Sequence, residues 1–277
     1  MKIQEEIIRS RQNPTVKWAS TLTDKKGREA SGAFIAEGLK LTLEAAASEL
    51  PVTHVFVMES KKEQLLGRVQ EAFRASQYAD TLCLTLSDDA FLKISTEKAP
   101  QGVISVIKYL DFFRELDIIY NVGFHFDYNQ KLLALSSVRD PSNLGSVIRS
   151  AVAFGVEHIL LSADCADPYN PKTVRSAMGA LFRVQITRVS DLAEAVSSLK
   201  RDGRRVFAAE LRDGARSISE VSLLPTDVVV IGNEGHGIDE AVSAACTHSV
   251  YIPISRATES LNAAVAAAIF MWEISKV

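Results

Sequence analysis

The sequence predicts an α/β protein of two domains, with a mostly parallel sheet in its C-terminal half. The chain has 277 residues, a length that suits two domains better than one. At 47% hydrophobic and 23% charged residues, its composition is that of an ordinary globular protein. From Lys131 onward, strand patterns alternate with helix patterns, and this alternation is typical of a parallel sheet.

Residues 1–108 predict a smaller α/β domain. A short strand over 33–36 leads into an amphipathic helix over 38–48. THVFVMES, residues 53–60, has apolar residues at both parities and so predicts a strand that is buried on both faces. A helix over 61–76, a strand over 81–87, a helix over 87–95 and a strand near 103–108 follow. Residues 109–130 mix aromatic and polar side chains without a clean period, and we interpret them as a linker.

Residues 131–277 repeat one unit, a strand followed by a helix. The predicted strands cover 132–138, 156–163, 184–189, 205–211, 227–234 and 249–254. The predicted helices cover 144–154, 171–182, 191–203, 238–246 and 260–275. Parallel sheets bind ligands beyond the carboxyl ends of their strands, so we look for functional residues there.

Charge alone does not identify a partner. The net charge of −3 weighs against nucleic acid, because phosphate contacts need lysine and arginine. Residues 9–28 nevertheless hold six basic side chains against one acidic side chain, which leaves open both a basic patch and an ordinary solvated helix. Three scattered cysteines without a CxxC pair predict reduced thiols in a cytoplasmic protein. The histidine spacing predicts no metal site, and no apolar stretch is long enough to predict a membrane span.

Unusual residues follow three of the predicted strands. In the first loop, RDPSNLGSVIRSA, we expect Asn143 to cap a helix that carries Arg149. The second loop, GNEGHG, lets a ligand approach its backbone, because three of its six residues are glycines. It has neither the dinucleotide fingerprint nor a P-loop, and Glu234 favours a ligand with hydroxyls, an amine or a guanidinium over a phosphate. Taken alone, the first loop is explained as a capped helix with a surface arginine, and the second is explained as a glycine-rich turn without a ligand.

The third loop, IPISRATESLN, covers residues 252–262. Pro253 ends the strand, and we expect Ser260 to cap the last helix with Asn262 in its first turn. A capped, buried helix explains Ser260 and the alanines that follow, but it does not explain Asn262. The order of the three loops, each at a strand end, is more specific than any one of them.

Together the loops resemble the three motifs of the SpoU family, a branch of the knotted SPOUT methyltransferases. The matching residues are Asn143 and Arg149 in the first motif, Gly232, Asn233, Glu234 and Gly235 in the second, and Ile252, Pro253, Ser260, Leu261 and Asn262 in the third. RSAMGALFR from Arg175 resembles a helix of the same family. NPTVK, FIAEG and PQGV in the N-terminal part resemble the substrate-binding domain of its ribosomal-RNA branch. The chain departs from the family pattern at Ser142, Met178 and Arg256.

The resemblance implies an RNA 2′-O-ribose methyltransferase that uses S-adenosylmethionine and works as a homodimer. It implies a C-terminal trefoil knot, an RNA substrate-binding domain over 1–108, a linker over 109–130 and a methyltransferase domain over 131–277. The implied catalytic residues are Arg149, Asn143, Glu234, Ser260 and Asn262. The implied cofactor-binding residues are Gly232, Ile252, Leu261, Asn233 and Gly235, and our candidates for RNA binding are Lys17, Lys25, Lys26 and Arg28.

Other functions are weighed against this one. A nucleotide-dependent oxidoreductase is disfavoured by the missing GxGxxG. A non-catalytic RNA-binding homologue is disfavoured by the five intact catalytic positions, although Arg256 in place of the usual glycine speaks for it. Within the family, transfer RNA is the alternative substrate, and the long N-terminal domain favours ribosomal RNA.

Overall fold

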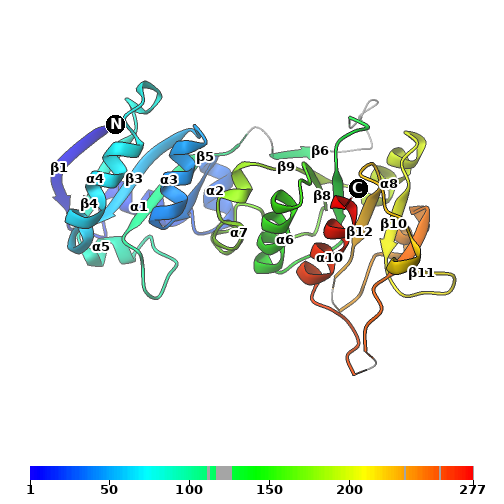
Figure 1. Cartoon of the computed structure of the whole chain (residues 1–277). Coiled ribbons are helices and arrows are strands. Elements are labelled where there is room, and N and C mark those ends of the chain that lie inside the picture. The colour runs from blue at the N-terminus through cyan, green and yellow to red at the C-terminus, as the bar shows by residue number, and fades with distance from the viewer. Residues whose placement is uncertain (111–112, 117–126, 234, 256, 277) are drawn as a thin grey trace. The chain divides into compact units, whose positions relative to one another are not determined.

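The computed structural model describes residues 1–110, 113–116, 127–233, 235–255 and 257–276 (Figure 1). The chain folds into two compact units. The first contains Met1–Leu110 and Tyr169–Phe182, and the second contains Asp111–Pro168 and Arg183–Val277. The division differs from the predicted bounds at two places: residues 169–182 belong to the first unit, and residues 113–116, within the predicted linker, form a strand of the second.

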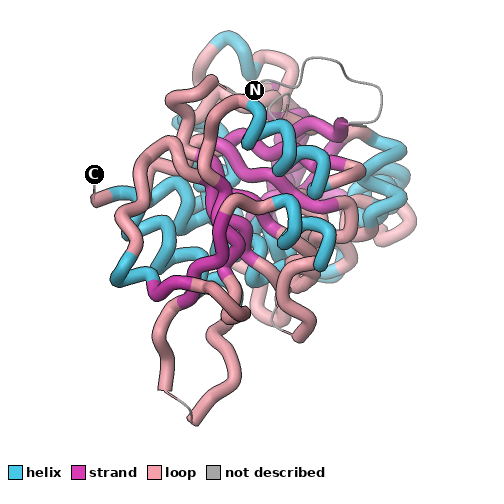
Figure 2. The backbone as a smooth tube through the Cα atoms, turned by 90° about the vertical axis from the view of Figure 1, so that its right-hand side faces the viewer, coloured by secondary structure: helices cyan, strands magenta, loops and turns pink. Residues whose placement is uncertain are grey.

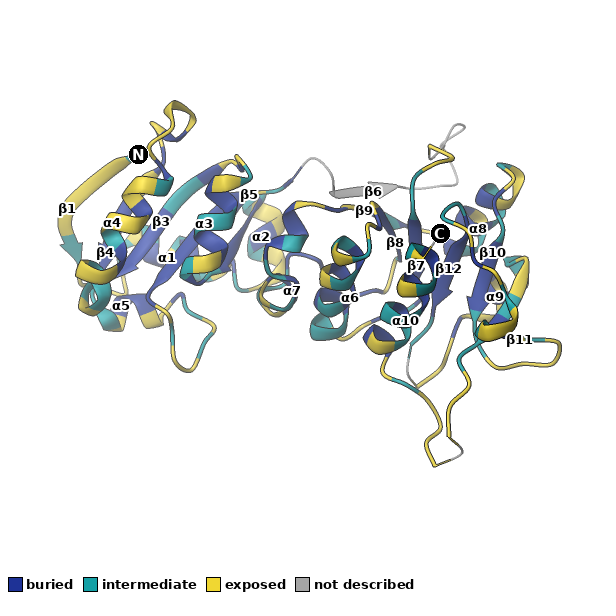
Figure 3. Ribbon diagram, viewed as in Figure 1, coloured by how far each residue is buried: buried dark blue, intermediate teal, exposed yellow. Residues whose placement is uncertain are grey.

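The first unit is built on a mixed five-stranded sheet in the order β1-β4-β3-β5-β2. Its strands are β1 (Lys2–Ile8), β2 (Ala33–Glu37), β3 (Val52–Met58), β4 (Leu82–Leu86) and β5 (Val103–Lys108). Its helices are α1 (Pro14–Thr21), α2 (Lys25–Ser31), α3 (Leu39–Ala47), α4 (Lys62–Ala72), α5 (Asp88–Leu92) and α7 (Pro171–Ala177). Strand β3 lies inside the sheet. Five of its seven residues are buried, four of them in a row, as its apolar pattern predicts. Strand β1 lies at an edge and is largely exposed (Figure 3).

Residues 169–182 are anchored to this unit by aromatic stacking. The Tyr169 ring lies between the rings of Phe34 and Tyr109, with centroids 4.5 and 4.4 Å away. Its hydroxyl oxygen accepts a hydrogen bond from the Leu110 N–H at 2.9 Å. Helix α7 then packs against β2, and the predicted helix over 171–182 continues as a 3-10 turn over Met178–Phe182.

The second unit is built on an eight-stranded sheet, and each strand pairing in its described part is parallel. The strand order is β11-β13-β10-β12-β7-β8-β9-β6. The strands are β6 (Phe113–Leu116), β7 (Leu132–Leu135), β8 (His158–Ser162), β9 (Gln185–Val189), β10 (Val206–Ala209), β11 (Arg216–Ser217), β12 (Val228–Ile231) and β13 (His248–Tyr251). The helices are α6 (Pro141–Ala153), α8 (Leu192–Arg201), α9 (Glu240–Ala245) and α10 (Ala263–Ser275).

Helices lie on both faces of this sheet (Figure 2). Alternate residues of the central strands pack with α8 and α9 in one apolar core, which includes Ala134, Val230 and Leu199. The opposite face carries α10, which contacts β12 and lies along α6. Since both faces are covered, the strands are apolar throughout, and the burial of all four residues in β7 and in β12 follows from this. The predicted α/β class and mostly parallel sheet are confirmed.

Two predicted helix caps are wrong. Helix α6 begins three residues earlier than predicted, because Pro141 suits a first helical position and Asp140 is the cap. The Asp140 carboxylate accepts from the N–H groups of Ser142 and Asn143 at 2.8 and 3.0 Å, so Asn143 lies within the first turn. Helix α10 is capped by Asn262 rather than by Ser260, and this leaves Ser260 in the exposed loop before the helix.

Candidate active site

The three motif loops lie at one edge of the second sheet. Strands β7, β12 and β13 are parallel to their neighbours, so their carboxyl ends point the same way. Ile231 pairs with Leu135 at the ends of β12 and β7, and the Ser136 N–H donates to the Ile231 carbonyl at 2.8 Å. The first two loops therefore leave the sheet side by side. From β7 the chain adds β8 and β9 on one side, and it then continues with β10 on the other side of β7. Such a reversal in strand order is the usual ligand site of an open α/β sheet.

Strand β10 lies between the strands that carry the second and third loops. Its Ala208 pairs with Val230 of β12 on one side and with Ser249 of β13 on the other. The Glu210 N–H donates to the Val250 carbonyl at 3.0 Å, so Glu210 and Leu211 emerge between the two loops. The Leu211 side chain is 79% exposed. The motifs did not identify these two residues, because only the order of strands in the sheet places them at the site.

The first and third loops are joined by a hydrogen bond between two predicted catalytic residues. The Asn262 Nδ2 donates to the Asn143 Oδ1 at 3.0 Å, although the residues are 119 positions apart. The Asn262 Oδ1 accepts from the N–H groups of Ala264 and Val265, at 2.9 and 3.3 Å. These two backbone donors determine which end of the amide is oxygen, so its nitrogen is the atom that faces Asn143.

The second loop is a tight turn that closes on itself. Asn233 and Gly237 exchange two backbone hydrogen bonds, at 2.9 and 2.8 Å. Gly237 has a φ of +70°, and a Cβ on Gly232 would lie 2.4 Å from the carbonyl carbon of Gly237. Both positions therefore need glycine for the turn itself. The Asn233 side chain ties the turn to the first loop, because its Nδ2 donates to the Ser137 carbonyl at 3.0 Å.

The structure brings some of the predicted residues together and separates others. Arg149 is exposed on α6, and among the described residues no hydrogen bond or ion pair joins it to Asn143, Ser260 or Asn262. Gly235 and Ser260 are exposed, whereas Gly232, Ile252 and Leu261 are half-buried. Glu234 and Arg256 lie outside the described residues.

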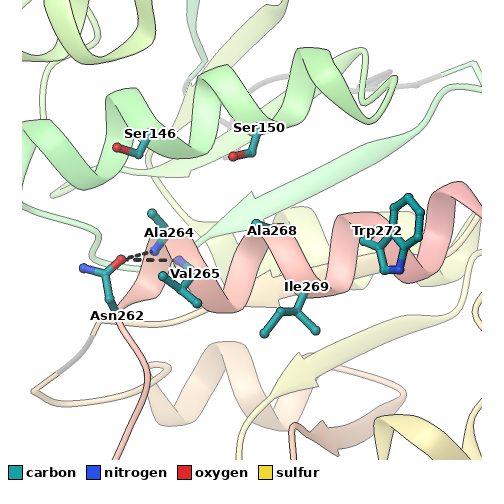
Figure 4. Close-up of a pocket in the computed structure, with 8 residues that line it drawn as sticks. All are labelled: Ser146, Ser150, Asn262, Ala264, Val265, Ala268, Ile269 and Trp272. Atoms are coloured by element: carbon teal, nitrogen blue, oxygen red, sulfur yellow. Dashed lines mark hydrogen bonds between the residues drawn. The ribbon is translucent and has the colours of Figure 1, made fainter.

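A groove beside this site is lined by residues of both α6 and α10 (Figure 4). It has a cavity volume of ≈ 490 Å³ and is lined by Ser146, Ser150, Asn262, Ala264, Val265, Ala268, Ile269 and Trp272. Val265 and Trp272 are 49% and 52% exposed, although both are large apolar side chains. Asn262 is the point at which the groove meets the motif loops.

The predicted RNA-binding residues lie on α1 and α2 of the first unit. Lys17, Lys25 and Lys26 are exposed. Arg28 is 1% exposed, and its guanidinium donates to the carbonyls of Leu22 and Thr23 at 3.1 and 2.9 Å. The expectation of an exposed cation at Arg28 is therefore corrected: this side chain is buried and holds the connection between the two helices.

The three cysteines are free thiols that are buried or half-buried. Burial raises the pKa of the Cys246 thiol to about 12 and that of Cys83 to about 11, and it also raises the pKa of Cys165. A protonated thiol is a poor nucleophile and a poor metal ligand. The described residues contain no group of three histidine, cysteine or acidic side chains that could hold a metal ion. Within the same residues, no helix is both long and apolar enough to span a bilayer.

Comparison with known proteins gives matches along most of the chain. The model of the SpoU rRNA Methylase family matches residues 130–272, and that of the MRM3-like substrate binding domain matches residues 13–105. A curated relative from Bacillus subtilis (strain 168), the 23S rRNA (guanosine(2553)-2'-O)-methyltransferase RlmP, is 31% identical over 96% of this chain and 98% of its own length.

Solved structures agree with these matches. An rRNA methyltransferase from Sinorhizobium meliloti has a TM-score of 0.81 at 26% identity, over 100% of this chain and 98% of its own. An AdoMet-bound rRNA methyltransferase from the same organism has a TM-score of 0.79 at 28% identity, over 99% and 98% of the two chains. The agreement extends over both units and not only over the motif loops.

Proposed function

Because the chain belongs to the SpoU rRNA methylase family, we propose that it transfers a methyl group from S-adenosylmethionine to a ribose 2′-hydroxyl of large-subunit ribosomal RNA. The observation that carries this proposal is the hydrogen bond between Asn143 and Asn262. It joins the first and third motifs at one edge of the sheet. The second loop, which runs from Gly232 to Gly237 and is called the glycine turn below, emerges from the same edge. The relative from Bacillus subtilis, named for the same reaction, supports ribosomal RNA as the substrate.

The residues at this edge fit S-adenosylmethionine. The cofactor combines a flat aromatic base with ribose hydroxyls, a sulfonium centre, an amine and a carboxylate. The edge offers the apolar Leu211, which is 79% exposed, together with main-chain groups of Gly232, Ile252 and Leu261. Asn233 and Gly235 complete the glycine turn that would border the cofactor. When bound, the cofactor supplies an activated methyl group on a sulfonium centre.

With an activated donor, the protein's main tasks are to position the ribose and to stabilise charge on its oxygen. A ribose hydroxyl is a weak nucleophile until its proton is shared or removed. Asn143 and Asn262 face each other across the first and third loops, and we assign to them the holding of the ribose and its phosphate. Ser260 stands two residues before Asn262, exposed and within the same loop, and we give it the same role.

We assign to Arg149 the stabilisation of the developing alkoxide. A guanidinium has only N–H donors and no acceptor for a proton, so it is a poor general base but a strong hydrogen-bond donor to an oxyanion. Arg149 is exposed on α6, one helical turn beyond Ser146 of the groove, and so it is free to reach a bound substrate. Glu234, in the glycine turn, is the residue that we expect to orient it.

We further propose that the enzyme is a homodimer and that α10 forms part of the interface. Val265, Ile269 and Trp272 make an apolar ridge on α10, and Ala264 and Ala268 allow another helix to approach closely. Apolar side chains of this size gain free energy when a second surface covers them. In a dimer with a two-fold axis, the same patch of a second copy would cover this ridge.

The remaining assignments concern RNA, topology and location. We propose that Lys17, Lys25 and Lys26 contact RNA phosphates, since all three are exposed on neighbouring helices. We propose a trefoil knot in the C-terminal segment. The insertion of β12 between β7 and β10, strands that precede it in the chain, supports this topology. The three unpaired cysteines support a cytoplasmic location.

The test is methyl transfer from labelled S-adenosylmethionine to an unmodified large-subunit rRNA transcript, with transfer RNA in parallel. We expect label at one position of the rRNA, and we expect the adjacent bond to resist alkaline cleavage. Label in transfer RNA alone would preserve the chemistry and overturn the proposed substrate. Cofactor binding without transfer to either RNA, or to a ribosomal precursor particle, would favour a non-catalytic RNA-binding role.

A further inference from the structure

An acidic side chain outside the three motifs joins the ends of β7 and β8. The Asp164 carboxylate accepts four hydrogen bonds from three side chains. The Ser137 Oγ lies 2.8 Å from Oδ2, and the Arg139 Nη2 and Nε lie 2.6 and 3.1 Å from the same oxygen. The Ser162 Oγ donates to Oδ1 at 2.7 Å. Both carboxylate oxygens are therefore engaged at the start of the first motif loop.

The same bonds hold Ser137 in an unusual backbone conformation. Its φ is +57°, in the left-handed region that residues with a Cβ seldom adopt. Its N–H donates to the Ser162 Oγ at 2.9 Å, and its own hydroxyl donates to Asp164. Asp164 thus fixes Ser137 directly and also through Ser162. Such a conformation persists where the surrounding contacts enforce it.

The direction of the Ser137 carbonyl matters because Asn233 binds to it. The Asn233 Nδ2 donates to this carbonyl at 3.0 Å, and the Asn233 Oδ1 accepts from the Gly235 N–H at 2.8 Å. A continuous path of hydrogen bonds therefore runs from Asp164 through Ser137 and Asn233 into the glycine turn. The place of that turn beside the first loop depends on the backbone angle at Ser137.

We propose that Asp164 is a positioning residue for cofactor binding: it enforces the left-handed turn at Ser137 and thereby, through Asn233, sets the position of the glycine turn. The inference rests on the proposed function, since it assigns a role to a residue near the site of methyl transfer. Burial raises the pKa of Asp164, but hydrogen bonds from Ser162, Arg139 and Ser137 outweigh it and lower the pKa to about 2. The group is therefore a carboxylate at neutral pH.

The loop that carries Asp164 has other supports, so its truncation is expected to leave the fold intact. The Arg188 guanidinium donates to the carbonyls of Ala163, Cys165 and Ala166 at 3.0, 3.1 and 3.0 Å. The Ala166 N–H donates to the Val138 carbonyl at 2.9 Å. These contacts do not involve the Asp164 carboxylate.

The test is Asp164→Ala in the full chain, with S-adenosylmethionine affinity measured by calorimetry well below the unfolding temperature. We expect the Kd to rise about tenfold, because the variant loses a network of charge-assisted hydrogen bonds. The KM for the cofactor should rise by the same factor, while kcat at saturating cofactor changes less than about threefold. The matched control is Glu194→Ala, which removes an exposed ion pair with Arg201 in the same unit and should leave both constants unchanged.

A second substitution that restores cofactor binding distinguishes a positioning role of Asp164 from a role in the stability of the fold alone. Glycine adopts a φ of +57° without a Cβ penalty, so Ser137→Gly added to Asp164→Ala should return the Kd to within about threefold of the wild type. A lower melting temperature with unchanged cofactor affinity would overturn the proposal, and so would a double variant without rescue. An inactive wild type would instead refute the proposed reaction, because wild-type transfer is measured beside the variants.

Discussion

Asn262 performs two tasks that substitution can separate. Its side-chain oxygen caps α10 by accepting from Ala264 and Val265, and its nitrogen holds Asn143. Asn262→Ala removes both interactions. Asn262→Asp keeps the cap, and a carboxylate is favourable at a helix N-terminus, but it has no N–H to donate to Asn143.

The magnitudes follow from these contacts. Loss of an N-cap costs about 1 kcal/mol in the free energy of unfolding. Loss of the hydrogen bond to Asn143 costs about 1 kcal/mol more, since the pair is neutral and exposed. For a protein unit of this size, each kcal/mol lowers the melting temperature by roughly 2–4 °C. We therefore expect Asn262→Ala to melt roughly 4–8 °C below the wild type and Asn262→Asp to lie between them.

Thermal unfolding followed by circular dichroism measures the stabilities, and methyl transfer to rRNA measures the function. We expect both variants to lose most activity, because the amide nitrogen is what pairs the third loop with the first. If Asn262→Ala melts with the wild type, the cap contributes nothing and the energetic argument is wrong. If Asn262→Asp methylates RNA at the wild-type rate, the amide donor has no part in the reaction.

The remaining predictions concern Arg149, helix α10 and the basic segment of the first unit. Arg149→Ala should abolish turnover yet bind S-adenosylmethionine with a Kd within about threefold of the wild type; lost cofactor binding would contradict its assignment to the alkoxide. Trp272→Lys should convert the dimer to a monomer, because it places a charge on the apolar ridge of α10. Analytical ultracentrifugation measures this, and an unchanged sedimentation coefficient would show that α10 does not form the interface. Lys25→Glu with Lys26→Glu should weaken RNA binding and reduce its salt dependence. Arg28→Gln should instead lower the melting temperature with little effect on that slope, since Arg28 is buried, and a shallower slope would refute this correction.

Local patterns predicted most of the secondary structure of the second unit. Strands buried on both faces are apolar at every position, and helices carry one apolar side, so β12 and α8 were recognisable from sequence. The helix starts were harder, because several residues near each start can cap. Asp140, Ser142 and Asn143 all have suitable side chains, and Pro141 decides the outcome by fitting the first helical position after Asp140.

Only some residues of the candidate site were predicted, because the others carry no motif. The resemblance to the family's motifs implied Asn143 and Asn262, and a hydrogen bond joins the two side chains in the structure. Leu211 and Asp164 carry no motif, and they reach the site because β10 and β8 lie beside the motif strands in the sheet. Strand order depends on contacts between distant segments, which a single sequence does not reveal. Arg28 was misjudged because a basic segment does not disclose which of its side chains turns inward.

Residues 169–182 affect how the first unit folds during synthesis, because they complete that unit from a distant part of the chain. As synthesis proceeds, Leu110 emerges long before Phe182, and 182 − 110 = 72 residues separate them. At about 5–20 residues per second, the unfinished unit waits roughly 4–14 s for Tyr169 and α7 to cover Phe34 and β2. A nascent chain in that interval exposes an apolar surface to chaperones. For the same reason, a fragment cut after residue 110 lacks part of its own core and is a poor candidate for independent expression.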